Sequence, residues 1–293
     1  MPSALTDSQW DTLIWRLKAE RCTPFLGAGA SAPYMPLGGE VAQQWTEGTG
    51  YPFANRDDLP GVAQWMAVRS QDHLRPKQQI QQDMKARAVP DFFAEKGQPH
   101  AVLAKLPIPI YITTNYDDYM AEALRRNAAL RRNPQVKVAL WNDSAFIDDE
   151  LRLTRKDGPF TPASPLVFHL HGHILSTESM VISEDDYVDF LVALGKHRDR
   201  VLPGIVQRAF TGTSLLFVGY QLRDWNFRVI HRALLADRPN SEKPLNVTVQ
   251  LDPKHADVAE YLTSYYKRMD VSVYWGSAIG FCKELDDRWT AAG

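Results

Sequence analysis

Cysteine is scarce in this 293-residue sequence, which contains only Cys22 and Cys282. Two thiols cannot form a four-cysteine zinc site, and two distant cysteines do not resemble the disulfide framework of a secreted protein. No stretch approaches the roughly 18 uncharged apolar residues of a membrane span. The first residues, Met1–Trp15, mix polar side chains into the apolar ones and so lack a signal-peptide core. We therefore expect a soluble, cytoplasmic protein with no membrane partner.

An excess of one charge is also absent, because 33 lysines and arginines nearly balance 35 aspartates and glutamates. This balance argues against a dedicated nucleic-acid-binding protein, which usually has a basic excess. Cationic residues gather locally at Arg125, Arg126, Arg131, Arg132 and Lys137. A solvated helix end and loop would explain them, and the alternative is contact with an acidic partner or nucleic acid. Hydrophobic residues at 44% and charged residues at 23% exclude wholesale disorder.

Short apolar runs separated by longer amphipathic segments are typical of an α/β protein with a Rossmann-like parallel sheet. The predicted strands are Pro24–Leu26, Ile108–Thr113, Val136–Leu140, Leu166–His171, Leu215–Val218, Val247–Leu251 and Val271–Tyr274. The predicted helices include Arg200–Phe210 and Asp224–Ala236. The first two strands are too far apart for one crossover helix. We expect a single domain over residues 1–293, with a helical insertion at about 45–100.

The first motif is Gly27-Ala28-Gly29-Ala30-Ser31, which follows a predicted strand. Glycines there allow a pyrophosphate to approach the backbone closely, although a glycine turn after a strand is also often purely structural. Ala32 replaces the third glycine of a dinucleotide fingerprint. A dehydrogenase would also need an acidic residue at the end of a second strand, and Glu40 comes too early.

The second motif, Ile110 to Asp118, ends an apolar strand in Thr114-Asn115 and two aspartates. Polar residues at the carboxyl end of a parallel strand lie where α/β proteins bind ligands. The structural alternative is that Thr114 or Asn115 caps the next helix, while Asp117 and Asp118 favour its positive end.

The third motif, Val167 to His173, places His169, His171 and His173 on one face if the strand continues. Three histidines on one face are one pattern that indicates a metal site, but Gly172 would bend the chain before His173. A general base or substrate-positioning histidine fits a strand end better, and a structural role is the third alternative.

The fourth motif, Leu215 to Asn226, runs from an apolar strand into Gly219 and a polar turn. Gln221 and Asp224 could contact ribose hydroxyls or phosphates, and Asp224 is also a plausible helix cap. Four polar clusters thus follow four predicted strands, which indicates one common site.

Taken together, these motifs resemble the sirtuin-like family, specifically its prokaryotic NADase branch. Gly27–Ser31 resembles the nucleotide loop, Thr114-Asn115-Tyr116-Asp117 the catalytic-asparagine motif, and Leu170-His171-Gly172 the catalytic-histidine motif. Val218–Asp224 resembles the ribose-binding turn. Ser183–Tyr187 resembles the segment that lies between the catalytic-histidine motif and that turn.

The resemblance implies that NAD is the substrate, cleaved to nicotinamide and ADP-ribose without a metal. It implies that Asn115 holds water at the nicotinamide ribose, Asp117 contacts the carboxamide and His171 acts as a base or ribose-hydroxyl partner. The binding residues it implies are Gly27, Ala28, Gly29, Ser31, Thr114, Gly219, Gln221 and Asp224.

Two departures favour hydrolysis over protein deacylation. No cysteine lies between Asn115 and the later strands, where deacylating sirtuins carry a zinc module, and Met35–Glu40 replaces their Pro-Asp-Phe-Arg run. The resemblance further implies a bacterial anti-phage effector that forms a homo-oligomer. The chain ends near the expected end of a catalytic domain, so a separate sensor is implied, such as a hexameric DNA-translocating ATPase or an Argonaute-type protein. The alternatives are a non-catalytic NAD or ADP-ribose-binding module, a deacylase, or a nuclease within a partner complex.

Overall fold

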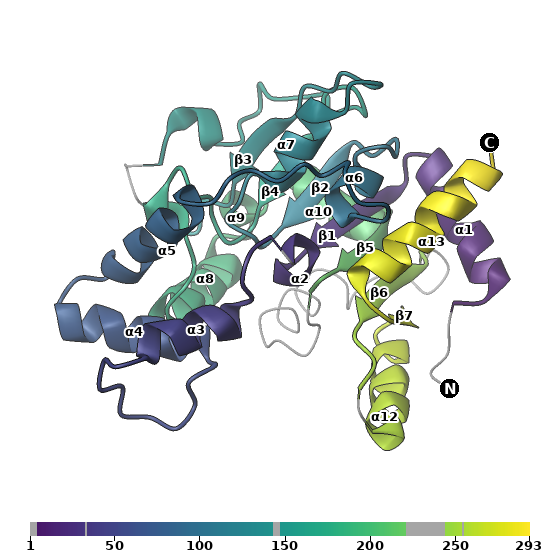
Figure 1. The fold of residues 1–293 in the computed structure, drawn as a ribbon. Coiled ribbons are helices and arrows are strands. Elements are labelled where there is room, and N and C mark those ends of the chain that lie inside the picture. The colour runs from purple at the N-terminus through teal and green to yellow at the C-terminus, as the bar shows by residue number, and fades with distance from the viewer. Residues whose placement is uncertain (1–4, 33, 143–146, 221–243, 254) are drawn as a thin grey trace.

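A seven-stranded parallel sheet forms the centre of the computed structural model, which describes residues 5–32, 34–142, 147–220, 244–253 and 255–293 (Figure 1). Its strand order is β3-β4-β2-β1-β5-β6-β7. The strands are β1 Cys22–Leu26, β2 Ile110–Thr113, β3 Gln135–Val138, β4 Leu166–His169, β5 Ser214–Val218, β6 Asn246–Gln250 and β7 Val271–Trp275. Every predicted strand is confirmed, with its ends shifted by a few residues, so the chain has a Rossmann-like α/β fold.

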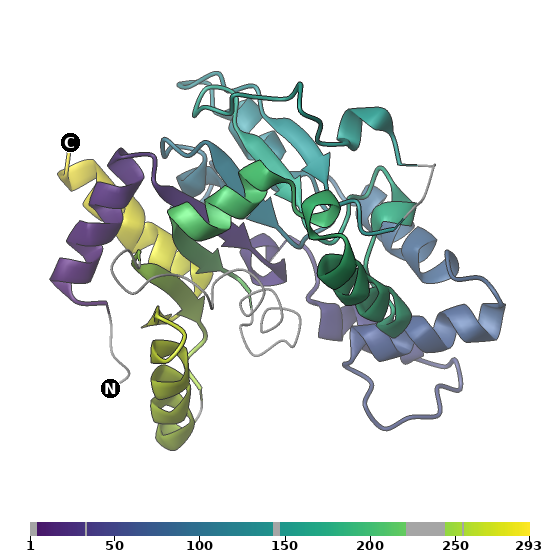
Figure 2. The same cartoon turned by 180° about the vertical axis from the view of Figure 1, so that it is seen from behind.

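Helices cover both faces of the sheet, as Figures 1 and 2 show from opposite sides. One face packs against α1 Asp7–Lys18, α6 Pro99–Leu103, α7 Tyr119–Arg126 and α13 Ala278–Ala291. The other packs against α8 Glu184–Lys196, α9 Arg198–Val201, α10 Gly204–Gly212 and α12 Ala256–Lys267. Neighbouring residues of each central strand point to opposite faces, so Phe25 joins one core and Leu26 the other.

The chain order reverses at β1, which lies between β2 and β5. The chain builds one half of the sheet from β1 to β4 and then crosses to β5 on the opposite side of β1. In such doubly wound sheets the loops after the two flanking strands diverge and leave a crevice at the carboxyl ends. The topology therefore predicts that a ligand would bind beside the loops that follow β1, β2 and β5.

A group of helices lies between β1 and β2, in the part of the chain where the sequence predicts a helical insertion. It comprises α3 Gly38–Thr46, α4 Leu59–Ser70 and α5 Arg75–Lys85. Val41, Ala63 and Ile80 form a small core with Met180 and Ile182. The insertion thus packs on the segment that follows β4, and in Figure 1 it lies beside α8.

A buried ion pair joins the insertion to α8. The Lys77 ammonium lies 2.7 Å from Asp186 Oδ1, and the two side chains are 3% and 12% exposed. Asp186 Oδ2 also accepts hydrogen bonds from the backbone N–H groups of Ile182 and Ser183. A charge pair this buried is costly to break from one side, so it holds α5 against the start of α8.

Two sequence predictions require correction. The predicted helix Arg200–Phe210 is two helices, α9 and α10, because Pro203 lies between them and cannot continue a helical hydrogen-bond pattern. A four-residue helix, α2 Ala28–Ser31, follows Gly27 directly and was not predicted. The predicted helix Asp224–Ala236 lies outside the described residues.

The clustered cations largely bind within the chain. Arg125 pairs with Asp118 and Glu122 at 2.7 and 2.8 Å, and Arg132 is buried. Lys137 pairs with Asp157 at 2.9 Å. These partners explain most of the cluster without nucleic acid. Across the described residues, no helix combines the length and apolar character that crossing a membrane requires.

Candidate active site

Three loops meet at the carboxyl ends of the central strands. Gly27 follows β1, Asn115 follows β2 and Gly219 follows β5. The Gly29 amide donates to the Gly219 carbonyl at 2.9 Å, and the Asn115 side chain donates to the Gly27 carbonyl at 3.1 Å. The structure therefore brings these three predicted site residues together at the point where the strand order reverses.

Asn115 is held on both its backbone and its side chain, and it is only 8% exposed. Its Nδ2 donates to the Gly27 carbonyl at 3.1 Å and to Ser31 Oγ at 3.0 Å. Its backbone carbonyl accepts from His169 Nδ1 at 2.9 Å. The Gly27 carbonyl can only accept, so the amide NH₂ must face it and Oδ1 points the other way.

Ser31 connects Asn115 with Asp117. Its hydroxyl accepts from Asn115 Nδ2 and donates to Asp117 Oδ2 at 3.0 Å, in a buried setting. Asp117 Oδ1 accepts from the Tyr119 amide at 3.0 Å at the start of α7. Asp117, rather than Thr114 or Asn115, therefore supplies this hydrogen bond to the helix.

Burial governs the charge of Asp117. Desolvation raises the pKa of its carboxyl from 3.8 to about 6, although the hydrogen bonds from Tyr119 and Ser31 favour the ionised form. The buried chain Asn115–Ser31–Asp117 thus ends in a carboxyl group whose pKa is raised to about 6.

The glycines allow the β1 and β5 loops to touch through their backbones. A Cβ on Gly27 would lie 2.6 Å from the Gly219 carbonyl oxygen. Gly219 has φ +68°, and a Cβ there would lie 2.0 Å from the Ala30 nitrogen. Glycine is required at these two positions for the packing of the loops, whatever they bind.

Thr114 and Ala28 lie at the same edge of the sheet. The Thr114 backbone N–H donates to the Leu26 carbonyl at 3.0 Å, which ties the end of β2 to the end of β1. Ala28 is exposed on the nucleotide-loop candidate, while Gly27 and Ser31 are buried. The remaining two predicted binding residues, Gln221 and Asp224, lie outside the described residues.

His171 is buried between aromatic rings of α8. Its ring centroid lies 5.5 Å from that of Tyr187 and 5.2 Å from that of Phe190, both edge-on. Burial lowers the pKa of His171 to about 3, which keeps the imidazole neutral. Its Nε2 has no hydrogen-bond partner among the described residues, and no hydrogen bond within that part of the chain joins it to Asn115.

The other two histidines of the third motif come together without His171, which corrects the predicted alternation. β4 ends at His169 rather than His171, and Gly172 at φ +88° turns the chain. As a result the rings of His169 and His173 lie 4.5 Å apart, with Asp118 beside them. Sequence analysis missed this grouping, because only the turn at Gly172 creates it.

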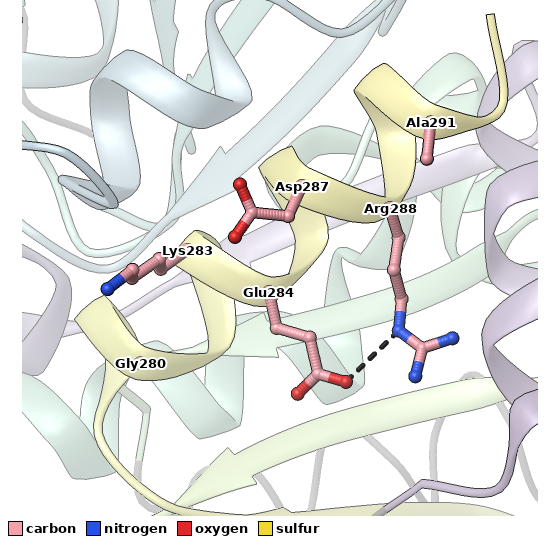
Figure 3. A pocket seen from close by; sticks show the side chains of 6 residues that line it. All are labelled: Gly280, Lys283, Glu284, Asp287, Arg288 and Ala291. Atoms are coloured by element: carbon pink, nitrogen blue, oxygen red, sulfur yellow. Dashed lines mark hydrogen bonds and ion pairs between the residues drawn. The ribbon is translucent and has the colours of Figure 1, made fainter.

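A shallow hollow along α13 is unrelated to these loops (Figure 3). It is lined by Gly280, Lys283, Glu284, Asp287, Arg288 and Ala291. Glu284 and Arg288 form an ion pair across one helical turn at 3.0 Å. None of the predicted site residues lines this hollow, so the loops at the carboxyl ends of β1, β2 and β5 remain the candidate active site.

Comparison with known protein families gives one match that includes most of the loops described above. The SIR2-like domain family matches residues 109–272, which is more than half of the chain. The chain therefore belongs to the SIR2-like domain family. The matched region begins just before β2, so it includes Asn115, Asp117, His171 and Gly219.

Among named proteins, the chain is similar to two bacterial proteins called NAD(+) hydrolase ThsA. It is 24% identical to the Acinetobacter baumannii protein over 221 residues, covering 75% of this chain and 40% of the relative. It is 25% identical to the Bacillus cereus protein over 215 residues, covering 72% and 39%. The aligned part thus spans about two fifths of each relative.

A solved structure described as a Sir2 homologue–NAD complex is also similar. It is 14% identical with a TM-score of 0.44, and the match covers 100% of this chain and 97% of that one.

Proposed function

We propose that this protein is an NAD glycohydrolase that cleaves NAD to nicotinamide and ADP-ribose. The observation that carries the proposal is the buried hydrogen-bonded chain Asn115–Ser31–Asp117 beside the Gly27 loop, at the point where the strand order reverses. Membership of the SIR2-like family and similarity to proteins named NAD(+) hydrolase support it. The diphosphate would lie along Gly27–Ser31, and the adenosine ribose beside Gly219.

The chemistry needs a positioned water more than a strong base. The bond from ribose C1′ to nicotinamide breaks with its electron pair going to the neutral leaving group, which leaves an oxocarbenium-like ribosyl centre. One water then forms the new C1′–O bond and loses a proton, so that NAD⁺ and water give nicotinamide, ADP-ribose and H⁺. Preorganised polar groups accelerate such a step by fixing the geometry in advance.

Asn115 is suited to holding that water. Its NH₂ group is engaged by Gly27 and Ser31, so Oδ1 is the atom that can accept a hydrogen bond from water. An amide orients water without competing as a nucleophile. The two hydrogen bonds fix the side chain before substrate binds, which reduces the ordering needed at the transition state.

His171 would accept the proton after the new bond has begun to form. A water bonded to an oxocarbenium carbon is strongly acidic, so a neutral imidazole with a pKa of about 3 is a sufficient acceptor. Asp117 already holds Ser31 and the Tyr119 amide, and its proposed contact with the nicotinamide carboxamide would use its remaining lone pairs. NAD is the substrate, and the hydrolysis we propose uses no metal.

The direct test is to incubate the purified protein with NAD and measure nicotinamide and ADP-ribose by chromatography. We expect the Asn115→Ala variant to lose at least about 100-fold in kcat, the scale of losing one preorganised polar group at a reacting centre. Asn133→Ala is the matched control, because Asn133 is exposed and its hydrogen bonds to Ala163 and Ser164 use its backbone. Equal rates for Asn115→Ala and the parent would overturn the assignment.

Two other results would select among the alternatives. If NAD binds and survives long incubation, the protein is a binding module for NAD or ADP-ribose. Activity that persists in Asn115→Ala and acts on nucleic acid would favour a nuclease within a partner complex. Deacylation is disfavoured, because the sequence between Cys22 and Cys282 offers no cysteine for a zinc module.

The biological setting we propose is anti-phage defence in the cytoplasm, in which depletion of NAD is the toxic output. Such an activity needs control, and we propose a homo-oligomer together with a separate sensor such as a hexameric DNA-translocating ATPase or an Argonaute-type protein. Mixing the protein with candidate sensors and measuring NAD loss over time would test this control.

A further inference from the structure

Asp118, His169 and His173 converge next to Asn115 but take no part in the hydrolysis described above. One ligand atom from each of the three side chains lies within 4.8 Å of those of the other two. The two histidines are each 1% exposed, and the Asp118 side chain is 29% exposed. We propose that these three residues bind a divalent transition-metal ion of the zinc class.

The atoms that face one another lack partners. Asp118 Oδ1, His169 Nε2 and His173 Nε2 are buried and make no hydrogen bond within the described residues. Buried polar atoms are nearly always satisfied, yet His169 Nε2 has no partner within the described residues, and His173 Nε2 and Asp118 Oδ1 have only a long contact with each other. His173 Nε2 and Asp118 Oδ1 lie 3.5 Å apart, close to the separation of about 3.4 Å between two ligands of a tetrahedral zinc ion.

His169 is oriented as a metal ligand. Its Nδ1 lies 2.9 Å from the Asn115 carbonyl, which can only accept, so Nδ1 carries the proton and Nε2 presents its lone pair to the cluster. Metal-binding histidines usually donate their second ring N–H to a carbonyl or carboxylate in this way. The same hydrogen bond would couple the ion to the backbone of Asn115.

The donor set selects the class of ion. Two imidazole nitrogens and one carboxylate oxygen suit Zn²⁺ and its first-row neighbours, whereas Mg²⁺ and Ca²⁺ prefer oxygen ligands. Asp118 Oδ2 is occupied by Arg125 at 2.7 Å, which leaves Oδ1 for the ion. The partly exposed Asp118 side chain provides the route of entry.

His173 must change its proton position when the ion binds. The Leu175 amide donates to His173 Nδ1 at 3.3 Å, so Nε2 carries the proton in the metal-free protein. Binding at Nε2 moves that proton to Nδ1, and the Leu175 amide must then turn away. Leu175 is 69% exposed, so this part of the chain borders water. We therefore expect the segment His173–Ser176 to rearrange on binding.

The site would act as a brace for the β2–α7 loop rather than as part of the reaction. The side chain of Asn115 faces Gly27 and Ser31, whereas its carbonyl faces His169. The ion would thus hold the backbone on the side away from the proposed water. Metal binding is independent of whether the protein cleaves NAD, so the two proposals can fail separately.

The experiment titrates metal-free protein, prepared by dialysis against a chelator, with Co²⁺ and Zn²⁺. We expect one Co²⁺ per chain with the visible absorption of a tetrahedral site, displaced by Zn²⁺ and unaffected by excess Mg²⁺. His169→Gln and His173→Gln should each weaken binding by more than about 100-fold, because even second-shell partners contribute 10–100-fold. His73→Gln is the matched control, because His73 is exposed.

The Arg125→Gln variant tests whether metal binding depends on the Asp118 carboxylate itself or on its ion pair with Arg125. It removes the cation on Asp118 Oδ2 but keeps the carboxylate, so binding should be retained or tightened. Melting curves of each variant without metal show whether it folds. For a variant that does not fold, the rise in melting temperature of the parent protein with Zn²⁺ but not with Mg²⁺ provides the readout. No 1:1 binding by the parent, or binding by both histidine variants that is as tight as that of the parent, would overturn the proposal.

Discussion

Replacing Asp117 with asparagine should stabilise the protein relative to the parent. The gain should be larger at pH 8 than at pH 5. Asp117 is 6% exposed, and burial raises the pKa of its carboxyl from 3.8 to about 6. The folded protein therefore binds more protons than the unfolded chain between pH 4 and 6. The stability that this group contributes falls as the pH rises through that window and is constant above it.

The magnitude follows from the size of the pKa change. A carboxyl raised to about 6 in the folded state disfavours folding by up to about 3 kcal/mol once it is ionised, at 1.36 kcal/mol per pKa unit. Asparagine has nearly the same shape, can accept from the Tyr119 amide and can pair with Ser31. We therefore expect the Asp117→Asn variant to gain about 2 to 3 kcal/mol relative to the parent between pH 4 and 8.

Urea unfolding of parent and variant at several pH values provides the measurement. The difference between the two proteins removes the contribution of every other titrating group. Asp57→Asn is the control, because it makes the same change of side chain at an exposed position. A parent-to-variant difference that is flat from pH 4 to 8 would refute the reasoning that burial governs this carboxyl.

Two further substitutions test the loops around Asn115. Ser31→Ala removes the hydroxyl between Asn115 and Asp117, so it should cost about 1.5–3 kcal/mol in urea unfolding and lower kcat for NAD more than it raises KM; an unchanged kcat would contradict the role of the hydroxyl in holding Asn115. Gly219→Ala should cost more than about 2 kcal/mol, because the left-handed backbone alone accounts for about 1–2 kcal/mol and the new Cβ lies 2.0 Å from a backbone nitrogen. Gly212→Ala, where a Cβ meets nothing within 4 Å, is its control, and equal unfolding midpoints would contradict the loop contact.

The centre of the sheet could be predicted from the sequence because strands such as β1 and β5 are short, mostly apolar runs buried on both faces. The strand Leu215–Val218 is an example, because all four of its side chains are apolar and they alternate between the two cores. The ends were less certain, because hydrogen bonding to neighbouring strands decides them. β4 stops at His169, two residues before the apolar pattern suggested.

The candidate site could be predicted only where its residues share a strand end. Gly27 and Gly219 directly follow a strand and Asn115 comes two residues after one, so parallel topology brings them together. Ser31 also lies near this edge, but its bridge between Asn115 and Asp117 depends on the unpredicted helix α2. His171 also lies just after the end of a strand, but its ring packs against Phe190 of α8.

The cluster of Asp118, His169 and His173 could not be predicted from the position of its residues along the strands. An alternating strand would have put all three histidines of the motif on one face. Gly172 instead adopts φ +88°, where a Cβ would lie 2.2 Å from the Ser179 carbonyl oxygen, so only glycine permits this turn. The turn brings His173 back to His169 and leaves His171 on the other side.

This arrangement gives the β2–α7 loop two independent supports. The Asn115 amide is held by Gly27 and Ser31, and its carbonyl is held by His169. A substitution of the Asn115 side chain leaves the carbonyl contact in place, because that contact uses only the backbone. Asn115→Ala therefore tests the chemistry of the amide, whereas His169→Gln tests the brace behind it. Loss of NAD cleavage in the first variant with normal metal binding would establish that the two faces of one residue serve separate purposes.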